Sequence, residues 1–265
     1  MRKQVWLIIP LIILIVIGGC KKKAHTLPDK ETANAITAYA PIPSYKEVFR
    51  FLDKYQAKEI SAAIPDELYK TKQEDVRNAF SLGVISVDAI LSAKGQNKKR
   101  LNQYYSQMLD LTSVLGLDEE VNQISPNLKK HINEGQWLEL ETAIDAHKKK
   151  VEDIFWEKEI FDYYTLLQLG SWIEATNRTA WLIQQNYSVE HTRALHQKEA
   201  FQNIIANMNN IDSEAIVNQP EFQEVMGLVQ QLKAIIDADY EKTYTSEQLD
   251  QIISLTNQIK ETFQK

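Results

Sequence analysis

The chain has little of what most recognisable catalytic sites require. Cys20 is its only cysteine, so it contains no Cys-x-x-Cys pair and no intramolecular disulfide. Glycine-rich phosphate loops, Gly-x-Ser-x-Gly and His-Glu-x-x-His are all missing from the sequence. No stretch alternates polar and apolar residues between turn glycines, which predicts essentially no β-sheet. These absences favour an all-α fold, and we predict no catalytic residue and no cofactor.

Positive charge is also scarce. The chain carries 30 Lys and Arg residues against 36 Asp and Glu, and its formal net charge is −6. Nucleic-acid binding needs clustered basic side chains to neutralise phosphates, so an acidic surface argues against a nucleic-acid partner. The one dense basic run is Lys21-Lys22-Lys23.

Histidine is sparse too, and it occurs in two His-x-x-Glu pairs, His131 with Glu134 and His196 with Glu199. This order is the reverse of the Glu-x-x-His motif of di-iron bundles, and the companion glutamates on apolar helices are missing. We therefore interpret both pairs as solvated surface charge and predict no metal site.

What is present begins at the N-terminus. Arg2 and Lys3 precede an apolar run, Val5 to Ile17, which closes on Ile17-Gly18-Gly19-Cys20. A positive start, an apolar middle and small residues before a cut site are the three parts of a secretory signal. The apolar run is shorter than the roughly twenty helical residues that cross a bilayer, so an uncleaved span is the weaker interpretation.

The closing tetrad resembles the lipobox of bacterial lipoproteins, and this resemblance covers only Met1 to Cys20. It implies that the Cys20 thiol is diacylglycerated and that cleavage before it makes Cys20 the first residue of a membrane-anchored protein. A Lys21 in place of the inner-membrane retention aspartate implies the periplasmic face of the outer membrane, provided the cell has two membranes. An ordinary signal with a chance cysteine, or an N-terminal apolar helix, is the alternative.

Three segments follow from these observations. Residues 1–19 are predicted to be the cleaved signal peptide. Residues 20–43 are predicted to be the lipidated N-terminus and a flexible tether, because the segment lacks apolar periodicity and contains Pro28, Pro41 and Pro43. The basic run beside Cys20 either contacts anionic head groups or is a plain solvated tether. Residues 44–265 are predicted to form one α-helical domain.

Helix start and stop signals recur along that domain. Hydroxyl residues at cap positions predict helix starts, three of them with Glu or Gln at the third position after the cap and one with a first-turn proline, Pro126. Glycines after apolar periodic stretches predict helix ends. The starts are Ser44, Thr71, Ser125, Ser188 and Thr245, and the ends are Gly95, Gly116 and Gly135. This series of helix starts and ends predicts an irregular multi-helix bundle or a short helical solenoid.

Two helices are apolar on nearly all sides and should be central, one from Val76 to Leu91 and one containing Phe161 to Ile173. Each contains a Leu-Gly pair, Leu82-Gly83 and Leu169-Gly170, which hints at two related halves. A glycine inside a helix costs up to about 1 kcal/mol relative to alanine. We therefore expect the two helices to pack closely against each other at Gly83 and Gly170.

Polar residues also follow one flank of each central helix. They are Arg77, Ser81, Asp88 and Ser92 on the first helix, and Gln168, Ser171 and Arg178 on the second. If these flanks faced each other, Asp88 and Arg178 could orient a ligand, with Trp172 and Tyr164 as flat walls. The alternative is structural, because buried polar groups normally pair with one another.

Three functional classes remain open. The first is a lipid-anchored envelope protein whose helical domain binds or scaffolds another envelope protein. The second is a lipid-anchored receptor that holds a small molecule between the central helices, near Asp88, Arg178 and Trp172. The third is an enzyme that uses carboxylates scattered along the sequence, which would require paired inward carboxylates in a cleft.

Overall fold

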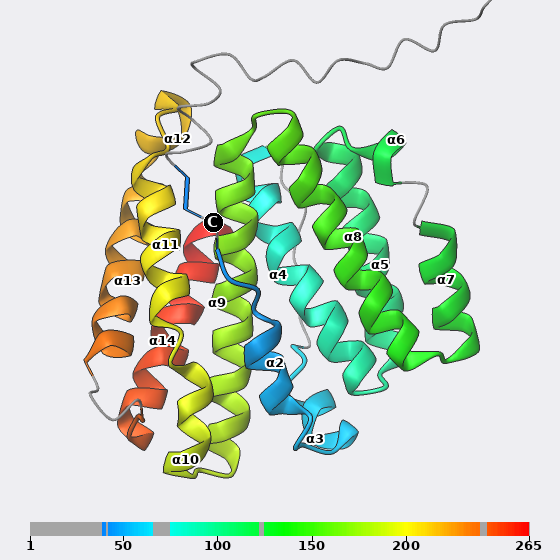
Figure 1. The fold of residues 1–265 in the computed structure, drawn as a ribbon, viewed down its shortest axis with the longest axis horizontal. Coiled ribbons are helices and arrows are strands. Elements are labelled where there is room, and N and C mark those ends of the chain that lie inside the picture. The colour runs from blue at the N-terminus through cyan, green and yellow to red at the C-terminus, as the bar shows by residue number, and fades with distance from the viewer. Residues whose placement is uncertain (1–38, 41, 66–74, 122–124, 239–242, 265) are drawn as a thin grey trace, which may run out of the picture.

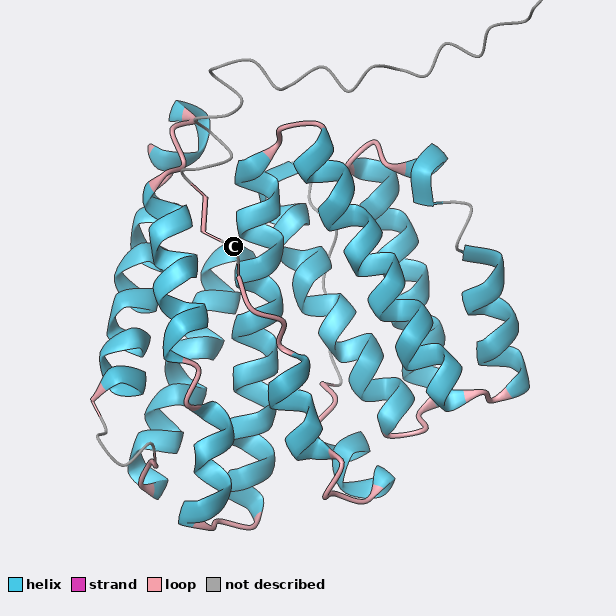
Figure 2. Cartoon of the chain, viewed as in Figure 1, coloured by secondary structure: helices cyan, strands magenta, loops and turns pink. Residues whose placement is uncertain are grey.

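The computed structural model describes residues 39–40, 42–65, 75–121, 125–238 and 243–264. Across these residues the regular secondary structure is entirely helical, as Figure 2 shows, which confirms the all-α prediction. Met1 to Cys20 and the predicted helix start at Thr71 lie outside the described residues.

The described helices differ widely in length. They are α2 (Lys46–Leu52), α3 (Ala57–Ala62), α4 (Asp75–Lys94), α5 (Lys98–Val114), α6 (Asp118–Val121), α7 (Ser125–Glu134), α8 (Trp137–Glu157), α9 (Phe161–Gln185), α10 (Val189–Thr192), the 3₁₀ turn η1 (Arg193–Leu195), α11 (Lys198–Asn209), α12 (Glu214–Val217), α13 (Pro220–Asp237) and α14 (Ser246–Gln264).

Helices α4 and α9 form the centre of the molecule and make its most extensive helix–helix contact. They run in the same direction and cross each other (Figure 1). Helices α5 and α8 cover α4, while α11 and α14 pack on α9 and α13 packs on both of these. A solenoid contacts only neighbouring repeats, whereas here α2 packs on α9 and α14 reaches α4, so the fold is a bundle.

The apolar character of α4 follows from this position. Among the described residues, its stretch Val76–Lys94 is the one helix with the length and mean hydropathy, 1.3, of a membrane span. Yet 89% of that stretch is buried inside the bundle. A core helix covered on all sides acquires the same composition, because each of its faces must be apolar.

The two central glycines confirm the expected close packing. A Cβ atom added at Gly83 would lie 2.1 Å from the backbone oxygen of Leu167, and one added at Gly170 would lie 2.1 Å from the oxygen of Phe80. Each glycine thus packs against the residue three positions before the other glycine. The two Leu-Gly pairs therefore meet in one reciprocal contact.

The predicted helix ends are confirmed at all three glycines, but the left-handed conformation expected after the helix is found at only two of them. Gly116 and Gly135 have φ of 70° and 67°, the left-handed conformation expected after a helix. After α4 that conformation belongs to Gln96, with φ of 53°, and not to Gly95. Gly95 instead permits close packing, because a Cβ there would lie 2.9 Å from the Ser61 nitrogen.

The predicted helix starts also divide into confirmed and corrected cases. The Thr245 hydroxyl accepts the Gln248 amide at 3.2 Å, and the Gln248 side chain accepts the Thr245 amide at 2.8 Å, so this capping box is confirmed. The segment that follows the start predicted at Ser188 is not one helix. It is divided into α10, η1 and α11, and Ser188 makes no capping hydrogen bond.

Contacts with the helical body are already made by Tyr39 and Ala40, which precede the helix start predicted at Ser44. The Asn207 side chain accepts the Ala40 amide at 2.7 Å and donates to the Ala40 carbonyl at 3.0 Å. The Trp172 indole donates to the Pro43 carbonyl at 3.0 Å. These contacts fix residues 39–40 and 42–43 of the predicted tether, which we call the strap, along α9 and α11.

Candidate functional site

The predicted ligand-binding residues do not share one wall. Arg178 Nε lies 3.5 Å from Asp88 Oδ1, so the two polar flanks do face each other. Trp172 points elsewhere, because its indole donates to the strap and its ring lies 6.2 Å from that of Phe201. Six helical residues separate Trp172 from Arg178, a rotation of about 240°, which places them on different faces of α9.

Asp88 and Arg178 belong to a buried charge network that joins α4, α9 and α14. Glu174 is bound by Arg178 at 2.5 Å and by Lys260 at 2.6 Å. Lys260 also donates to Asn177 Oδ1 at 3.1 Å, and Asn177 donates to Thr256 Oγ1 at 2.8 Å. A network shared by three helices fixes how they pack on one another.

Asp88 and Glu174 differ in their titration although both are fully buried. Burial, followed by the charge of Glu174, raises the pKa of Asp88 well above its ordinary value. Burial also acts to raise the pKa of Glu174, but the charges of Arg178 and Lys260 outweigh it and lower that pKa to about 2. Asp88 therefore holds a proton in conditions where Glu174 carries the negative charge.

These paired carboxylates are inward, but they do not lie in a cleft. Neither Asp88 nor Glu174 exposes any surface, and the Arg178 side chain is only 13% exposed. A substrate would reach neither carboxyl without separating the central helices. The network thus matches the structural alternative, in which the polar side chains of the two flanks pair with one another. A ligand site would have to lie nearer the surface.

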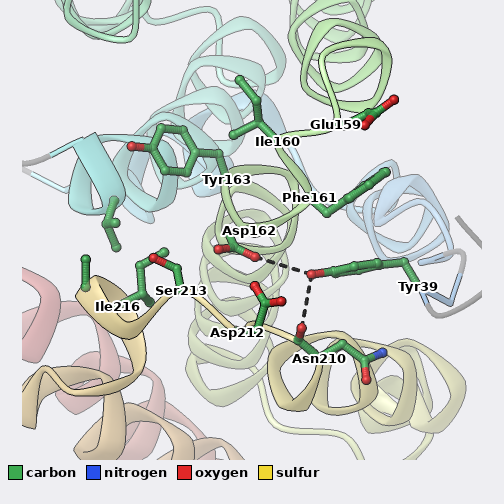
Figure 3. A pocket seen from close by; sticks show the side chains of 12 residues that line it. Tyr39, Glu159, Ile160, Phe161, Asp162, Tyr163, Asn210, Asp212, Ser213 and Ile216 are labelled. Atoms are coloured by element: carbon green, nitrogen blue, oxygen red, sulfur yellow. Dashed lines mark hydrogen bonds between the residues drawn. The ribbon is translucent and has the colours of Figure 1, made fainter. Parts of the chain in front are cut away.

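A cavity of about 520 Å³ opens where α9 begins, and we call it the Asp162 pocket (Figure 3). It is formed by the α8–α9 turn, the first turn of α9, the loop from α11 into α12, the start of α4 and Tyr39 of the strap. Its lining combines three carboxylates with three aromatic rings: Glu159, Asp162 and Asp212, and Tyr39, Phe161 and Tyr163. None of its lining residues is Lys, Arg or His.

Tyr39 closes one side of the Asp162 pocket. Its hydroxyl lies 3.3 Å from Asp162 Oδ1 and 3.4 Å from the Asn210 carbonyl, both acceptors for its single proton (Figure 3). Its ring stacks on Phe161 with centroids 4.9 Å apart. Phe161 is supported from behind by the edge of Trp156, at 5.1 Å. The strap is therefore part of the pocket as well as its connection to the N-terminus.

The electrostatics of the pocket favour a positively charged occupant. Burial raises the pKa of Asp162, the charge of Asp212 raises it further, and the hydrogen bond from Tyr39 lowers it. Burial and the charge of Asp162 raise the pKa of the Tyr39 hydroxyl. Both shifts are caused mainly by burial, and the neighbouring carboxylates add to them.

The turn that leads into the pocket is strained. Glu159 has φ of 61°, which is uncommon for a residue other than glycine. The turn is held because the Ile160 amide bonds the Phe155 carbonyl at 2.8 Å. Backbone strain of this kind costs about 1–3 kcal/mol and is found more often at functional sites than elsewhere.

A metal ion is a poor fit to this lining. In the described part of the chain, no group of three or more His, Cys, Asp or Glu side chains is arranged to hold one. The two predicted surface histidines have other neighbours, since His131 contacts the Gln136 side chain and His196 Nδ1 lies 3.4 Å from the Tyr244 hydroxyl.

The sequence prediction missed the Asp162 pocket. Tyr39 lies 123 residues from Asp162 and was assigned to the tether. The available signal was Asp162 itself, a carboxylate in the first turn of one of the two central apolar helices. Comparisons of the chain with protein-family models, with curated proteins and with solved structures found no match.

Proposed function

We propose that the protein is a lipid-anchored envelope protein that binds an organic cation, an ammonium or guanidinium group, in the Asp162 pocket. The observation that carries this proposal is the lining, which joins Glu159, Asp162 and Asp212 to three aromatic rings without a basic side chain. The function is binding, and none of the pocket residues needs to act as a catalyst.

The lining matches an organic cation better than a bare metal ion. Aromatic faces attract ammonium and guanidinium groups with about 0.5–2 kcal/mol, more where the pocket is dry. The carboxylate of Asp162 is half-buried and supplies the charge partner. Part of the free-energy cost of removing water from it is therefore met on folding, before a cation binds. The hydrocarbon part of the ligand would lie against apolar side chains such as Val76 and Ile216.

The anchor would set where this pocket works. The lipobox resemblance makes Cys20 the acylated residue, and Tyr39 follows it by about twenty residues. That length of chain spans at most about 65 Å when fully extended. The anchor would therefore keep the pocket within about that distance of the membrane. The cation belongs either to a free small molecule or to a Lys or Arg side chain of an envelope protein. The second case corresponds to a scaffold role.

Thermal unfolding of the acylated full-length protein in detergent tests the binding proposal. Spermidine, choline and an Arg-rich peptide are each compared with NaCl at equal ionic strength. A higher Tm with spermidine or choline supports a small-molecule receptor, and a higher Tm with the peptide alone supports a protein partner. If no cation raises the Tm beyond the NaCl control, the proposed function is wrong.

The lipid anchor is tested separately with Cys20→Ser. Intact mass and membrane fractionation of the wild-type protein should show acyl chains on Cys20, no residues before it, and retention in the membrane. The variant should lose the lipid and appear in the soluble fraction. A variant that stays acylated or membrane-bound contradicts the anchor.

A further inference from the structure

A second cavity, of about 370 Å³, lies between the start of α2, the middle of α8 and the first turns of α9. We call it the Lys148 cavity. Its lining shares no residue with that of the Asp162 pocket. Its volume falls in the range of small-molecule sites, about 300–1,000 Å³. Unlike the Asp162 pocket, it contains side chains of both charges, including Asp145, Lys148 and Glu152.

Lys148 is a charged side chain that the fold buries beside this cavity. The residue is 5% exposed, and its ammonium group pairs with Glu152, lies 3.4 Å from Gln168 Oε1 and sits 5.1 Å over the ring of Tyr45. Burying a lysine costs several kcal/mol unless its partners are well placed. Residues from α8, α9 and the start of α2 thus hold one ammonium group in place.

Tyr45 supplies a second indication of a ligand. The residue is 2% exposed and lines the cavity, yet its hydroxyl has no hydrogen-bond partner within the described residues. A buried hydroxyl left without a partner costs about 1–3 kcal/mol. Burial, then the charges of Asp145 and Glu152, raise the pKa of Tyr45, so the group remains a proton donor. A ligand hydroxyl could both accept from it and donate to a nearby carboxylate.

The charges around the cavity already neutralise one another. Lys148 pairs with Glu152, and the exposed Lys149 pairs with Asp153 at 3.0 Å. In the lining itself Asp145 and Glu152 balance Lys148 and Lys149, so neither an anion nor a cation would meet an excess of opposite charge there. Groups that both donate and accept, such as hydroxyls, can bond to each charged side chain without breaking these pairs.

We propose that the Lys148 cavity binds a neutral polyhydroxylated molecule, a mono- or disaccharide. The Tyr45 hydroxyl and the Lys148 ammonium group donate to its hydroxyls, and Glu152 accepts from them. Tyr164 offers an aromatic edge or face, and its hydroxyl stays protonated because burial raises its pKa to about 12. This inference is independent of cation binding in the Asp162 pocket.

Isothermal titration of the full-length protein with glucose, N-acetylglucosamine and maltose tests this inference. Tyr45→Phe removes only the unpartnered hydroxyl, so it should weaken binding of the best of these sugars at least about tenfold, equivalent to about 1.4 kcal/mol. The same variant should keep or raise the Tm, because the free protein loses an unsatisfied polar group. A purely structural tyrosine would lower the Tm instead.

Tyr39→Phe serves as the matched control, since it removes a tyrosine hydroxyl from the Asp162 pocket and should leave sugar binding unchanged. The inference is overturned if none of the three sugars binds the wild-type protein. It is also overturned if Tyr45→Phe binds them equally well, or if glycine or inorganic phosphate binds in the cavity and the sugars do not.

Discussion

Gly83 of α4 and Gly170 of α9 lie in reciprocal contact, each against the backbone three residues before the other. The contact leaves no room for a side chain, since an added Cβ would stand 2.1 Å from a carbonyl oxygen in either case. The two parallel helices therefore approach as closely as their backbones allow. This approach brings Asp88, Glu174 and Arg178 together one to two turns further on.

Gly83→Ala and Gly170→Ala should each destabilise the protein by about 3 kcal/mol or more, because the helices must separate to admit the methyl group. Urea unfolding followed by circular dichroism measures the change. Gly227→Ala in α13 is the matched control, since an added Cβ meets nothing within 4 Å. It should be neutral or stabilise by up to about 1 kcal/mol. Equal effects at Gly83 and Gly227 would disprove the close packing.

Glu174→Gln should destabilise the protein by about 3–5 kcal/mol, because it leaves Arg178 and Lys260 buried without their carboxylate. Glu190→Gln removes an exposed pair with Arg193 and should cost less than about 1 kcal/mol. Because folding lowers the pKa of Glu174, its contribution to the stability of the fold decreases as the pH falls. Its contribution is complete above pH 4.5 and is lost as pH falls towards 2. A small loss for Glu174→Gln would show that the network is dispensable.

His147 should make the fold sensitive to mild acid. It is 1% exposed, neither ring nitrogen has a hydrogen-bond partner within the described chain, and burial lowers its pKa to about 4. His147 therefore binds a proton near pH 6.5 in the unfolded chain, whereas in the folded protein it binds one only near pH 4. Stability is complete above pH 6.5 and falls as pH decreases, by about 2 kcal/mol at about pH 4.5.

His147→Met should remove this part of the acid sensitivity, which urea unfolding at about pH 7 and about pH 4.5 would show. The variant should gain stability relative to wild type at the lower pH. His131→Gln should retain the wild-type loss, because it leaves His147 in place. An unchanged pH dependence in His147→Met would assign the acid sensitivity to other groups.

The strap depends on Asn207, which bonds both backbone groups of Ala40 and is itself fully buried. Asn207→Ala should release the strap, and hydrogen exchange at the Ala40 amide should accelerate. The cost in global stability should be about 1–3 kcal/mol. The exposed neighbour Asn209, changed to Ala, is the control and should leave the exchange rate as it was. Equal protection in both variants would show that the contacts of Tyr39 and Pro43 hold the strap without Asn207.

Local patterns predicted most of the fold. Apolar periodicity and mid-helix glycines identified α4 and α9 as the central pair. Buried helix faces require apolar residues and a close approach requires glycine, so both features occur within the two segments themselves. The stop signals at Gly116 and Gly135 act within a few residues and were also readable. The packing role of Gly95 was not predicted, because the glycine contacts Ser61 of another helix and no local pattern records such a contact.

The candidate site was far less predictable. The sequence left open whether Asp88 and Arg178 face each other. Their pairing is buried together with Glu174 and Lys260, and Lys260 lies on the last helix. Trp172 was grouped with them by sequence proximity, although helical rotation turns it towards the strap. Tyr39 reaches Asp162 only because the strap folds back along the body. Contacts between distant segments of this kind have no signature in a single sequence.

Calorimetric titration of spermidine into the full-length protein, for wild type, Asp162→Asn and Glu190→Gln, measures cation binding in the Asp162 pocket directly. Asp162→Asn should weaken binding at least about tenfold, and Glu190→Gln, an equal loss of charge on α10 away from the pocket, should leave it unchanged. Wild-type affinity should also fall as the pH is lowered through the raised pKa of Asp162, because the protonated carboxyl loses its charge. Equal affinity in wild type and Asp162→Asn, or an equal loss in both variants, would contradict a cation site in this pocket.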